Sequence, residues 1–220
     1  MEQINQYLEI IREIIVKISM KDNNLMEFNE MMQKQLRIDK NKIEIILVSL
    51  DIIGDTQEAI NNFLQYGLKE EVGEKYIRLY GLLNAIYLHS QAVVSLGKYF
   101  NVKNITDMEK FLNSKIILDV RHKLGAHSVN YENLDKTISC YTPIRMLMEA
   151  STLVFYNMNP QSTESETINL YDEIHKYILY AKNIIKETVV KLSTTIYKTA
   201  PNKLQQINKK IVQIEISKVN

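Results

Sequence analysis

The sequence predicts an all-α fold, and three observations carry that prediction. Apolar residues recur every three to four positions through most of the 220 residues. The chain holds only 6 Gly and 3 Pro, while 45% of its residues are hydrophobic, a composition typical of a packed globular protein. Helix-start signals precede several of the apolar runs. We expect long central and C-terminal helices in a bundle, with short β elements at most near 137–142 and 211–217.

The first half of the chain predicts four or five helices. A first helix carries the stripe Ile4, Tyr7, Leu8, Ile11, Ile15 and Ile18. A Met-rich segment near 24–37 predicts a second helix. Asp39 is a candidate N-cap for a helix that ends at Gly54, with a short helix to Tyr66 after it. The segment 70–100 is apolar on several faces, which is typical of a central, buried helix.

The second half begins with a capping box, Thr106-Asp107-Met108-Glu109, for a short helix ending near Leu112. Asn113 or Ser114 is then expected to cap a helix with the apolar face Ile116, Ile117, Val120 and Leu124. A final long helix is expected over 164–197, and the loop that leads into it over 157–162.

Two segments depart from the helical pattern. Residues 137–142 are β-branched and precede Pro143, so they predict a short strand or the lead-in to a helix capped by Thr142. Residues 211–217 alternate apolar and polar side chains like a strand. A lone strand is not stable, so we hypothesise that the two segments pair with each other or with another subunit. The domain prediction is therefore one helical domain over 1–200 and a C-terminal tail over 201–220, as a strand or disordered.

The segment Asp119–Val129 concentrates the candidate chemistry of the chain. Arg121 and His127 stand on either side of five residues, and His122 and Lys123 follow the arginine directly. A histidine can transfer protons near neutral pH, and an arginine can hold phosphate oxygens with two parallel N–H groups. This pattern favours phosphoryl-transfer chemistry, with Arg121 and His127 as catalytic candidates and His122 and Lys123 as supporting or substrate-binding ones.

Helical geometry separates the two catalytic candidates. Six positions along an unbroken α-helix turn the chain by roughly 600°, so Arg121 and His127 would lie about 120° apart. Gly125 offers one solution, because a glycine in the left-handed conformation could end the helix and let His127 fold back. A second copy of the chain offers another, with each pair facing its counterpart across a two-fold axis. The structural alternative is a plain helix end with ordinary surface charges.

The Arg–five residues–His arrangement, with polar His122 straight after Arg121, resembles the motif of the HEPN superfamily. The resemblance covers about seven residues directly, and the helical pattern of the chain agrees with it. It implies a HEPN-like helical bundle, a homodimer with a composite active site, and a metal-independent endoribonuclease that needs no cofactor. It also implies a prokaryotic toxin or anti-phage defence context, with an antitoxin or defence protein as partner. Some members carry a modifiable tyrosine two residues after the histidine, a pattern from which Tyr131 departs.

The resemblance implies roles for the motif residues. His127 would activate the 2′-hydroxyl of RNA, Arg121 would hold the adjacent phosphate, and His122 would orient one of them or contact the substrate. Lys123 would contact a neighbouring phosphate or lie as a solvated helix lysine. The alternatives are a non-catalytic HEPN-like module for binding or dimerisation and, third, an antitoxin or immunity-type protein.

Charge and cysteine content indicate which partners and which cell compartment to expect. The net charge is +1, but the segment from Lys182 onward contains eight lysines and only two glutamates. This end could attract phosphates or an acidic partner, or it could simply form a solvated helix face. Cys140 is the only cysteine, which excludes an internal disulfide and fits a reducing cytoplasm. No apolar run reaches about 18 residues, so we expect no membrane span, and the first residues lack a signal core.

The remaining histidines and acids give no further site. His89 and His175 lie in predicted helices and are expected to be structural, and Cys140 is expected to be a small core residue. No Cys/His/Asp/Glu set has the spacing of metal ligands, so no metal site is predicted.

Overall fold

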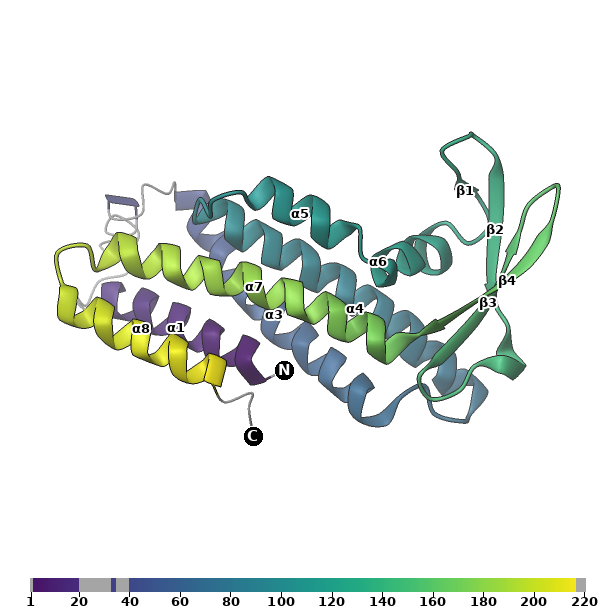
Figure 1. Ribbon diagram of the computed structural model, residues 1–220, viewed down its shortest axis with the longest axis horizontal. Coiled ribbons are helices and arrows are strands. Elements are labelled where there is room, and N and C mark those ends of the chain that lie inside the picture. The colour runs from purple at the N-terminus through teal and green to yellow at the C-terminus, as the bar shows by residue number, and fades with distance from the viewer. Residues whose placement is uncertain (1, 20–32, 35–39, 217–220) are drawn as a thin grey trace. The chain divides into compact units, whose positions relative to one another are not determined.

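The computed structural model describes residues 2–19, 33–34 and 40–216, and it combines long helices with one antiparallel sheet (Figure 1). The prediction of an all-α fold is therefore wrong. The four strands pair in chain order, and they are β1 (Tyr131–Glu132), β2 (Ile138–Pro143), β3 (Thr152–Met158) and β4 (Thr163–Asn169). The helices are α1 (Glu2–Ser19), α3 (Lys40–Tyr66), α4 (Val72–Tyr99), α5 (Ile105–Asn113), α6 (Ile116–Val120), α7 (Leu170–Ile196) and α8 (Pro201–Ile216).

The chain divides into two compact units, and the long helices α3, α4 and α7 contribute residues to both. The first unit takes residues from 1–54, 91–109 and 180–220, and the second takes 55–90 and 110–179. The sheet, the α6 helix and the Arg121–His127 segment all belong to the second unit. The prediction of a single domain over 1–200 stays a prediction.

In the first unit, α1 and α8 are joined by polar side chains at a buried helix face. The Tyr7 hydroxyl donates to the Glu215 carboxylate, and Gln3 donates through Nε2 to the Ile214 carbonyl oxygen. Lys182 of α7 completes the network, with its Nζ 3.4 Å from Glu215 Oε1. Burial and the nearby carboxylate raise the pKa of Tyr7, so the phenol stays protonated as the donor.

The tail forms a helix, so the prediction of a strand near 211–217 is wrong for its described part. Its buried residues are Ile207, Ile211 and Ile214, spaced by four and three positions. That spacing is the helical period, which the short window from residue 211 concealed because it also fits an alternating pattern. Pairing between this segment and residues 137–142 is excluded with it.

The strand predicted near 137–142 is present as β2, and the helical alternative there is wrong. β2 pairs with β1 through Tyr131 and Ser139, and with β3 through Cys140 and Met158. The segment 157–162, expected to be a loop before the last helix, is the turn of the β3–β4 hairpin, closed by a hydrogen bond from Asn159 N to Ser162 O at 3.0 Å. The last long helix starts only at Leu170, because 163–169 forms β4.

The helix predictions are otherwise close, with three local errors. Thr106 does not cap a helix, because α5 already begins at Ile105. Gly54 does not end a helix: α3 continues to Tyr66, and Ile53 and Ile60 keep its buried face intact. Neither Asn113 nor Ser114 caps the motif helix, since Lys115 is the N-cap residue of α6 and makes no side-chain cap bond. The Met-rich helix near 24–37, apart from residues 33–34, and the Asp39 cap lie outside the described residues.

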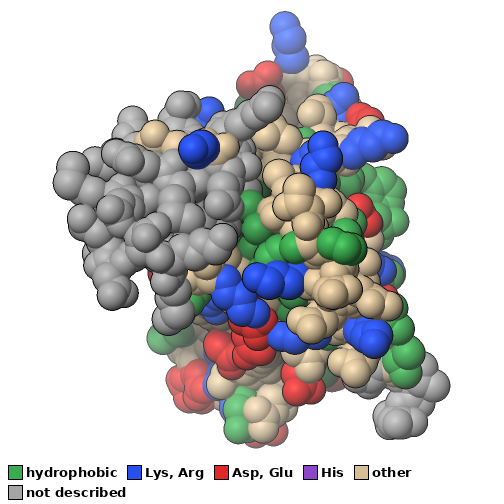
Figure 2. All heavy atoms as spheres, turned by 90° about the vertical axis from the view of Figure 1, so that its left-hand side faces the viewer, with side chains coloured by type: hydrophobic (Ala, Val, Ile, Leu, Met, Phe, Trp, Pro, Cys, Tyr) green, Lys and Arg blue, Asp and Glu red, His purple; other side chains and the backbone are tan. Residues whose placement is uncertain are grey.

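The lysine-rich C-terminal part is partly neutralised within the first unit. Glu215 lies within 4 Å of Lys182 and Lys186, and Lys210 forms an ion pair of 2.8 Å with Glu13. Figure 2 shows Lys and Arg side chains on this end of the molecule with Asp and Glu side chains beside them. No described helix is long and apolar enough to span a membrane.

A buried histidine ties α4 to α7 in the second unit. His89 is fully buried, its Nδ1 lies 2.7 Å from the Tyr177 hydroxyl, and that hydroxyl donates to the Ile86 carbonyl oxygen at 3.2 Å. The Nε2 atom has no hydrogen-bond partner in the described part of the chain. Burial lowers the pKa of His89 to about 3, so the neutral ring is the folded form.

We expect His89 to make the protein sensitive to acid. In the unfolded chain a histidine takes up a proton near pH 6.5, whereas folded His89 resists it until about pH 3, so stability present above pH 6.5 is lost as the pH falls. Urea unfolding at pH 7 and pH 4.5 should show a loss of about 2–3 kcal/mol from this group. His89→Asn should reduce the loss, and His175→Asn, on the exposed side of α7, should retain it. An unchanged pH dependence in His89→Asn would contradict the assignment.

Candidate functional site

The Arg121–His127 segment continues α6 without a break, but with a wider turn. Residues Arg121–Ala126 form the π-helical turn η1, in which the His127 N–H donates to the His122 carbonyl oxygen five residues back, at 2.9 Å. Gly125 lies inside this turn and is not left-handed, so the prediction that it reverses the chain is wrong. A Cβ at Gly125 would meet only Arg121 Cγ, at 3.8 Å. π-Helical turns often occur at functional sites.

Arg121 is held by an aromatic ring. Its guanidinium carbon lies 3.9 Å from the centroid of the Tyr87 ring on α4, a cation–π contact. Its Nη1 lies 3.5 Å from His122 Nδ1, which makes a weak hydrogen bond when the proton of the imidazole is on Nε2. Within the described ranges, Arg121 forms no ion pair within 4 Å. Its charge is therefore held in place without being neutralised.

His122 rests against the same tyrosine. Its ring meets Tyr87 edge to face, with 6.3 Å between centroids and 78° between planes, and the residue remains exposed. Partial burial lowers the pKa of His122, and the charges of Arg121 and His127 lower it further, while Asp119 opposes them. A histidine with a pKa below 6.5 is mostly neutral at pH 7 and can accept a proton there.

His127 is exposed at the end of η1. Its backbone closes the π-turn toward His122 and accepts a hydrogen bond from Asn130 N at 3.1 Å. Among the described residues, its side chain makes no hydrogen bond with Arg121. The structure thus brings Arg121 into direct contact with His122, and it brings His127 within electrostatic range of His122.

Lys123 turns away from this cluster and is neutralised. Its Nζ lies 3.0 Å from Asp119 Oδ2 and 3.6 Å from Glu166 Oε2, and 5.2 Å from the centroid of the Tyr141 ring. Burial alone would lower the pKa of Lys123, but the hydrogen bond and the charges of Asp119 and Glu166 outweigh it and raise the pKa. Lys123 therefore stays charged, with its charge already paired.

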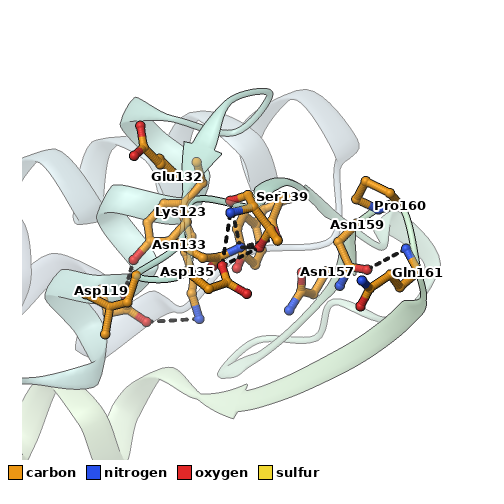
Figure 3. Close-up of a pocket in the computed structure, with 14 residues that line it drawn as sticks. Asp119, Lys123, Glu132, Asn133, Asp135, Ser139, Asn157, Asn159, Pro160 and Gln161 are labelled. Carbon is orange, nitrogen blue, oxygen red and sulfur yellow. Dashed lines mark hydrogen bonds and ion pairs between the residues drawn. The ribbon is translucent and has the colours of Figure 1, made fainter.

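Lys123 and Asp119 form one wall of a pocket of about 690 Å³ (Figure 3). The β1–β2 hairpin supplies the middle of the pocket, and the tip of the β3–β4 hairpin supplies the opposite wall. Its polar lining residues are Asp119, Lys123, Tyr131, Glu132, Asn133, Asp135, Thr137, Ser139, Tyr141, Asn157, Asn159 and Gln161. Arg121, His122 and His127 do not line it.

The sequence did not reveal this pocket because its residues come largely from two hairpin tips. We expected a loop over 157–162 and assigned no element to 130–136. The visible signal was the density of Asn, Asp, Ser and Thr in residues 130–139 and 157–163, the residue types that form side-chain turns. Asp135 accepts from Thr137 N at 3.0 Å, and Asn159 Oδ1 accepts from Gln161 N at 2.8 Å. These bonds shape the two hairpin tips.

The other candidate residues, Cys140 and His175, make contacts with backbone carbonyl oxygens in the described chain. Cys140 is half-buried, and its thiol donates to the Val129 carbonyl oxygen at 3.3 Å. His175 Nδ1 lies 2.6 Å from the Tyr171 carbonyl oxygen, one turn back in α7. Among the described residues no group of three His, Cys, Asp or Glu side chains could hold a metal ion.

In comparisons with known proteins, no family model, no curated protein and no solved structure matches the chain.

Proposed function

We propose that the protein is an endoribonuclease of the HEPN type that cleaves RNA without a metal ion, in a prokaryotic toxin or anti-phage defence context. The observation that carries the proposal is the pairing state of the two neighbouring cations. Lys123 is matched by Asp119 and Glu166, whereas Arg121 rests on Tyr87 and has no carboxylate within ion-pair distance in the described chain. An unpaired guanidinium beside two exposed histidines is suited to receive a phosphate.

The proposed reaction uses the RNA as its own nucleophile. The 2′-hydroxyl oxygen attacks the adjacent phosphorus, a histidine takes its proton, and the bond from phosphorus to the 5′-oxygen breaks as that oxygen receives a proton. The products are a 2′,3′-cyclic phosphate and a 5′-hydroxyl end. Arg121 holds the non-bridging oxygens and stabilises their charge in the transition state. His122 and His127 act as the proton-transfer pair, with neutral His122 suited to accept the first proton.

RNA cleavage in EDTA tests this proposal. Wild type should cut a mixed RNA pool and leave cyclic-phosphate ends, and Arg121→Ala should reduce the rate by about 100-fold or more, because a lost charge-stabilising donor typically costs that much. His127→Ala and His122→Ala should each reduce it about 100-fold, the usual contribution of a proton-transfer group.

Arg145→Ala is the matched control for the arginine. Arg145 also lies over a tyrosine of α4, with its guanidinium carbon 5.9 Å from the Tyr76 centroid, so its removal deletes a similar contact away from the histidines. The control should cleave like wild type. If folded wild type does not cleave, the alternative of a non-catalytic binding or dimerisation module replaces this proposal. If the double variant Arg121→Ala/His127→Ala cleaves as fast as wild type, the activity does not come from this site and the proposal is wrong.

We further propose that the site is completed by a second copy of the chain, bound along α4. Ile77, Tyr80 and Leu88 are 74%, 42% and 41% exposed. On a helix they share one face with Gly81, at which a Cβ would meet nothing within 4 Å. Tyr87, which carries Arg121, borders that face, one residue from Leu88. An exposed apolar stripe with a small residue at its centre suits close helix packing, and it would bring two Arg121 clusters toward each other.

Dimerisation is measured by sedimentation of wild type and Leu88→Glu. We expect a wild-type dimer at micromolar concentration and a folded Leu88→Glu monomer, because a charge in an apolar contact is costly to bury. The monomer should also lose RNA cleavage. Val48→Glu, at an apolar position of α3 that is 55% exposed, is the control and should remain dimeric. A monomeric wild type would contradict the composite site.

A further inference from the structure

The proposed phosphate chemistry makes no use of the pocket between the two hairpins and α6. Three carboxylates, Asp119, Glu132 and Asp135, line it with a single ammonium group, Lys123. Hydrogen bonds to Thr137 lower the pKa of Asp135, so this carboxyl is ionised at neutral pH. A pocket with this excess of negative charge repels phosphate, and its ligand is therefore neutral or positively charged.

Several donors of the pocket are already used within the chain, whereas the Tyr141 hydroxyl and Gln161 Nε2 make no hydrogen bond among the described residues. Lys123 pairs with Asp119 and Glu166, and the Tyr131 hydroxyl donates to Asp119 Oδ1 at 3.3 Å. Asn133 Nδ2 lies within 3.1 Å of three acceptors, namely Thr137 O, Thr137 Oγ1 and Ser139 Oγ. Most N–H and O–H groups of these three residues are therefore engaged within the chain.

Its acceptors, in contrast, have spare capacity. A carboxylate offers about four lone-pair positions, and Asp119 uses one oxygen for Tyr131 and the other for Lys123. Both bonds to Asp135 fall on Oδ1. On the facing wall, Asn157 Oδ1 has no hydrogen-bond partner in the described chain. These carboxylates and the Asn157 carbonyl oxygen therefore favour a ligand that donates hydrogen bonds.

We propose that this pocket is a base-recognition subsite that binds an RNA nucleobase carrying an exocyclic amino group: cytosine, adenine or guanine. The inference rests on the proposed ribonuclease function. Its volume of about 690 Å³ suits a nucleoside, and Tyr131 and Tyr141 supply aromatic surface for a planar ring. Carboxylates accept from the amino group of cytosine in protein–nucleic acid contacts, whereas uracil presents a carbonyl oxygen at the same place.

Asp119 connects the pocket with the phosphate site. It lines the pocket, and its charge raises the pKa of His122 against the combined effect of burial and of Arg121. Asp119 and His122 lie on either side of Arg121 in the sequence, on the continuous α6–η1 helix. The pocket at Asp119 and the Arg121 cluster therefore lie on different faces of that helix, although Asp119 and Arg121 are only two positions apart in the sequence.

Binding of free cytidine and uridine to the full-length protein, followed by NMR, tests the proposal without any cleavage step. The two nucleosides differ at the position where one carries the amino group. Cytidine should bind at least about fivefold more tightly than uridine, and adenosine should resemble cytidine. Asp119→Asn should remove the preference, because the carboxamide offers a donor where the carboxylate only accepts.

Glu132→Gln is a second variant at an exposed position of the pocket, in case the loss of Asp119 unfolds the protein, and it should weaken the preference for cytidine. Arg145→Ala, outside the pocket, should leave nucleoside binding unchanged. If no nucleoside binds, if uridine binds as tightly as cytidine, or if both folded pocket variants keep the wild-type preference, the subsite does not exist. RNA cleavage together with any of those results would overturn the subsite alone. A cytidine preference in a protein that cleaves no RNA would overturn the ribonuclease function and leave a nucleoside site.

Discussion

The stacking of Arg121 on Tyr87 is the contact on which the candidate site depends. A carboxylate partner would fix the guanidinium equally well but would cancel its charge, as happens to Lys123 two residues later. An aromatic face contributes only about 0.5–1 kcal/mol at an exposed position, and it leaves the N–H groups at the edge of the guanidinium available. Tyr87 also receives the edge of the His122 ring, so one side chain of α4 positions both members of the cluster. Burial lowers the pKa of His122 and the charge of Arg121 lowers it further, so the two proposed site residues are electrostatically coupled.

The antiparallel sheet gives the helical scaffold a second surface beside this cluster. The α6–η1 segment presents Arg121 and His122 to Tyr87 on one side, and Asp119 and Lys123 to the two hairpins on the other. The unpaired guanidinium of Arg121 and the carboxylate of Asp119 are thereby kept apart along a single turn of helix. Such a separation suits a ligand with an anionic backbone and neutral bases, because each part meets groups of matching chemistry. Asp119 belongs to both environments through its pocket position and its effect on His122.

The sequence predicted the helices well and the sheet poorly, for physical reasons. The apolar stripes of α1 and α7 follow the helical period over many turns, so their pattern is unambiguous, and the length of the apolar segment indicated α4. The β4 strand (TESETIN) is mostly exposed and polar, and it pairs with β3 over seven residues without an apolar stripe that periodicity could detect. For the C-terminal tail we predicted a strand where the structure has a helix, because a short window around Ile211 and Ile214 fits both the strand period and the helix period. The site residues were found by residue type, yet their partners were not: Tyr87 and Asp119 gain their roles from contacts that depend on the π-turn and on α4 packing.

The most direct test of this account is the NMR titration of the His122 ring in wild type, Arg121→Gln and Arg145→Gln. An unneutralised guanidinium lies next to His122, so removing the Arg121 charge should raise the pKa of His122 toward 6.5. The matched change at Arg145 should leave the titration unchanged. Asp119→Asn should shift the same pKa downward, because the carboxylate opposes the arginine. A His122 titration that is the same in Arg121→Gln as in wild type would mean that the guanidinium does not lie beside this ring, and the proposed cluster would not exist.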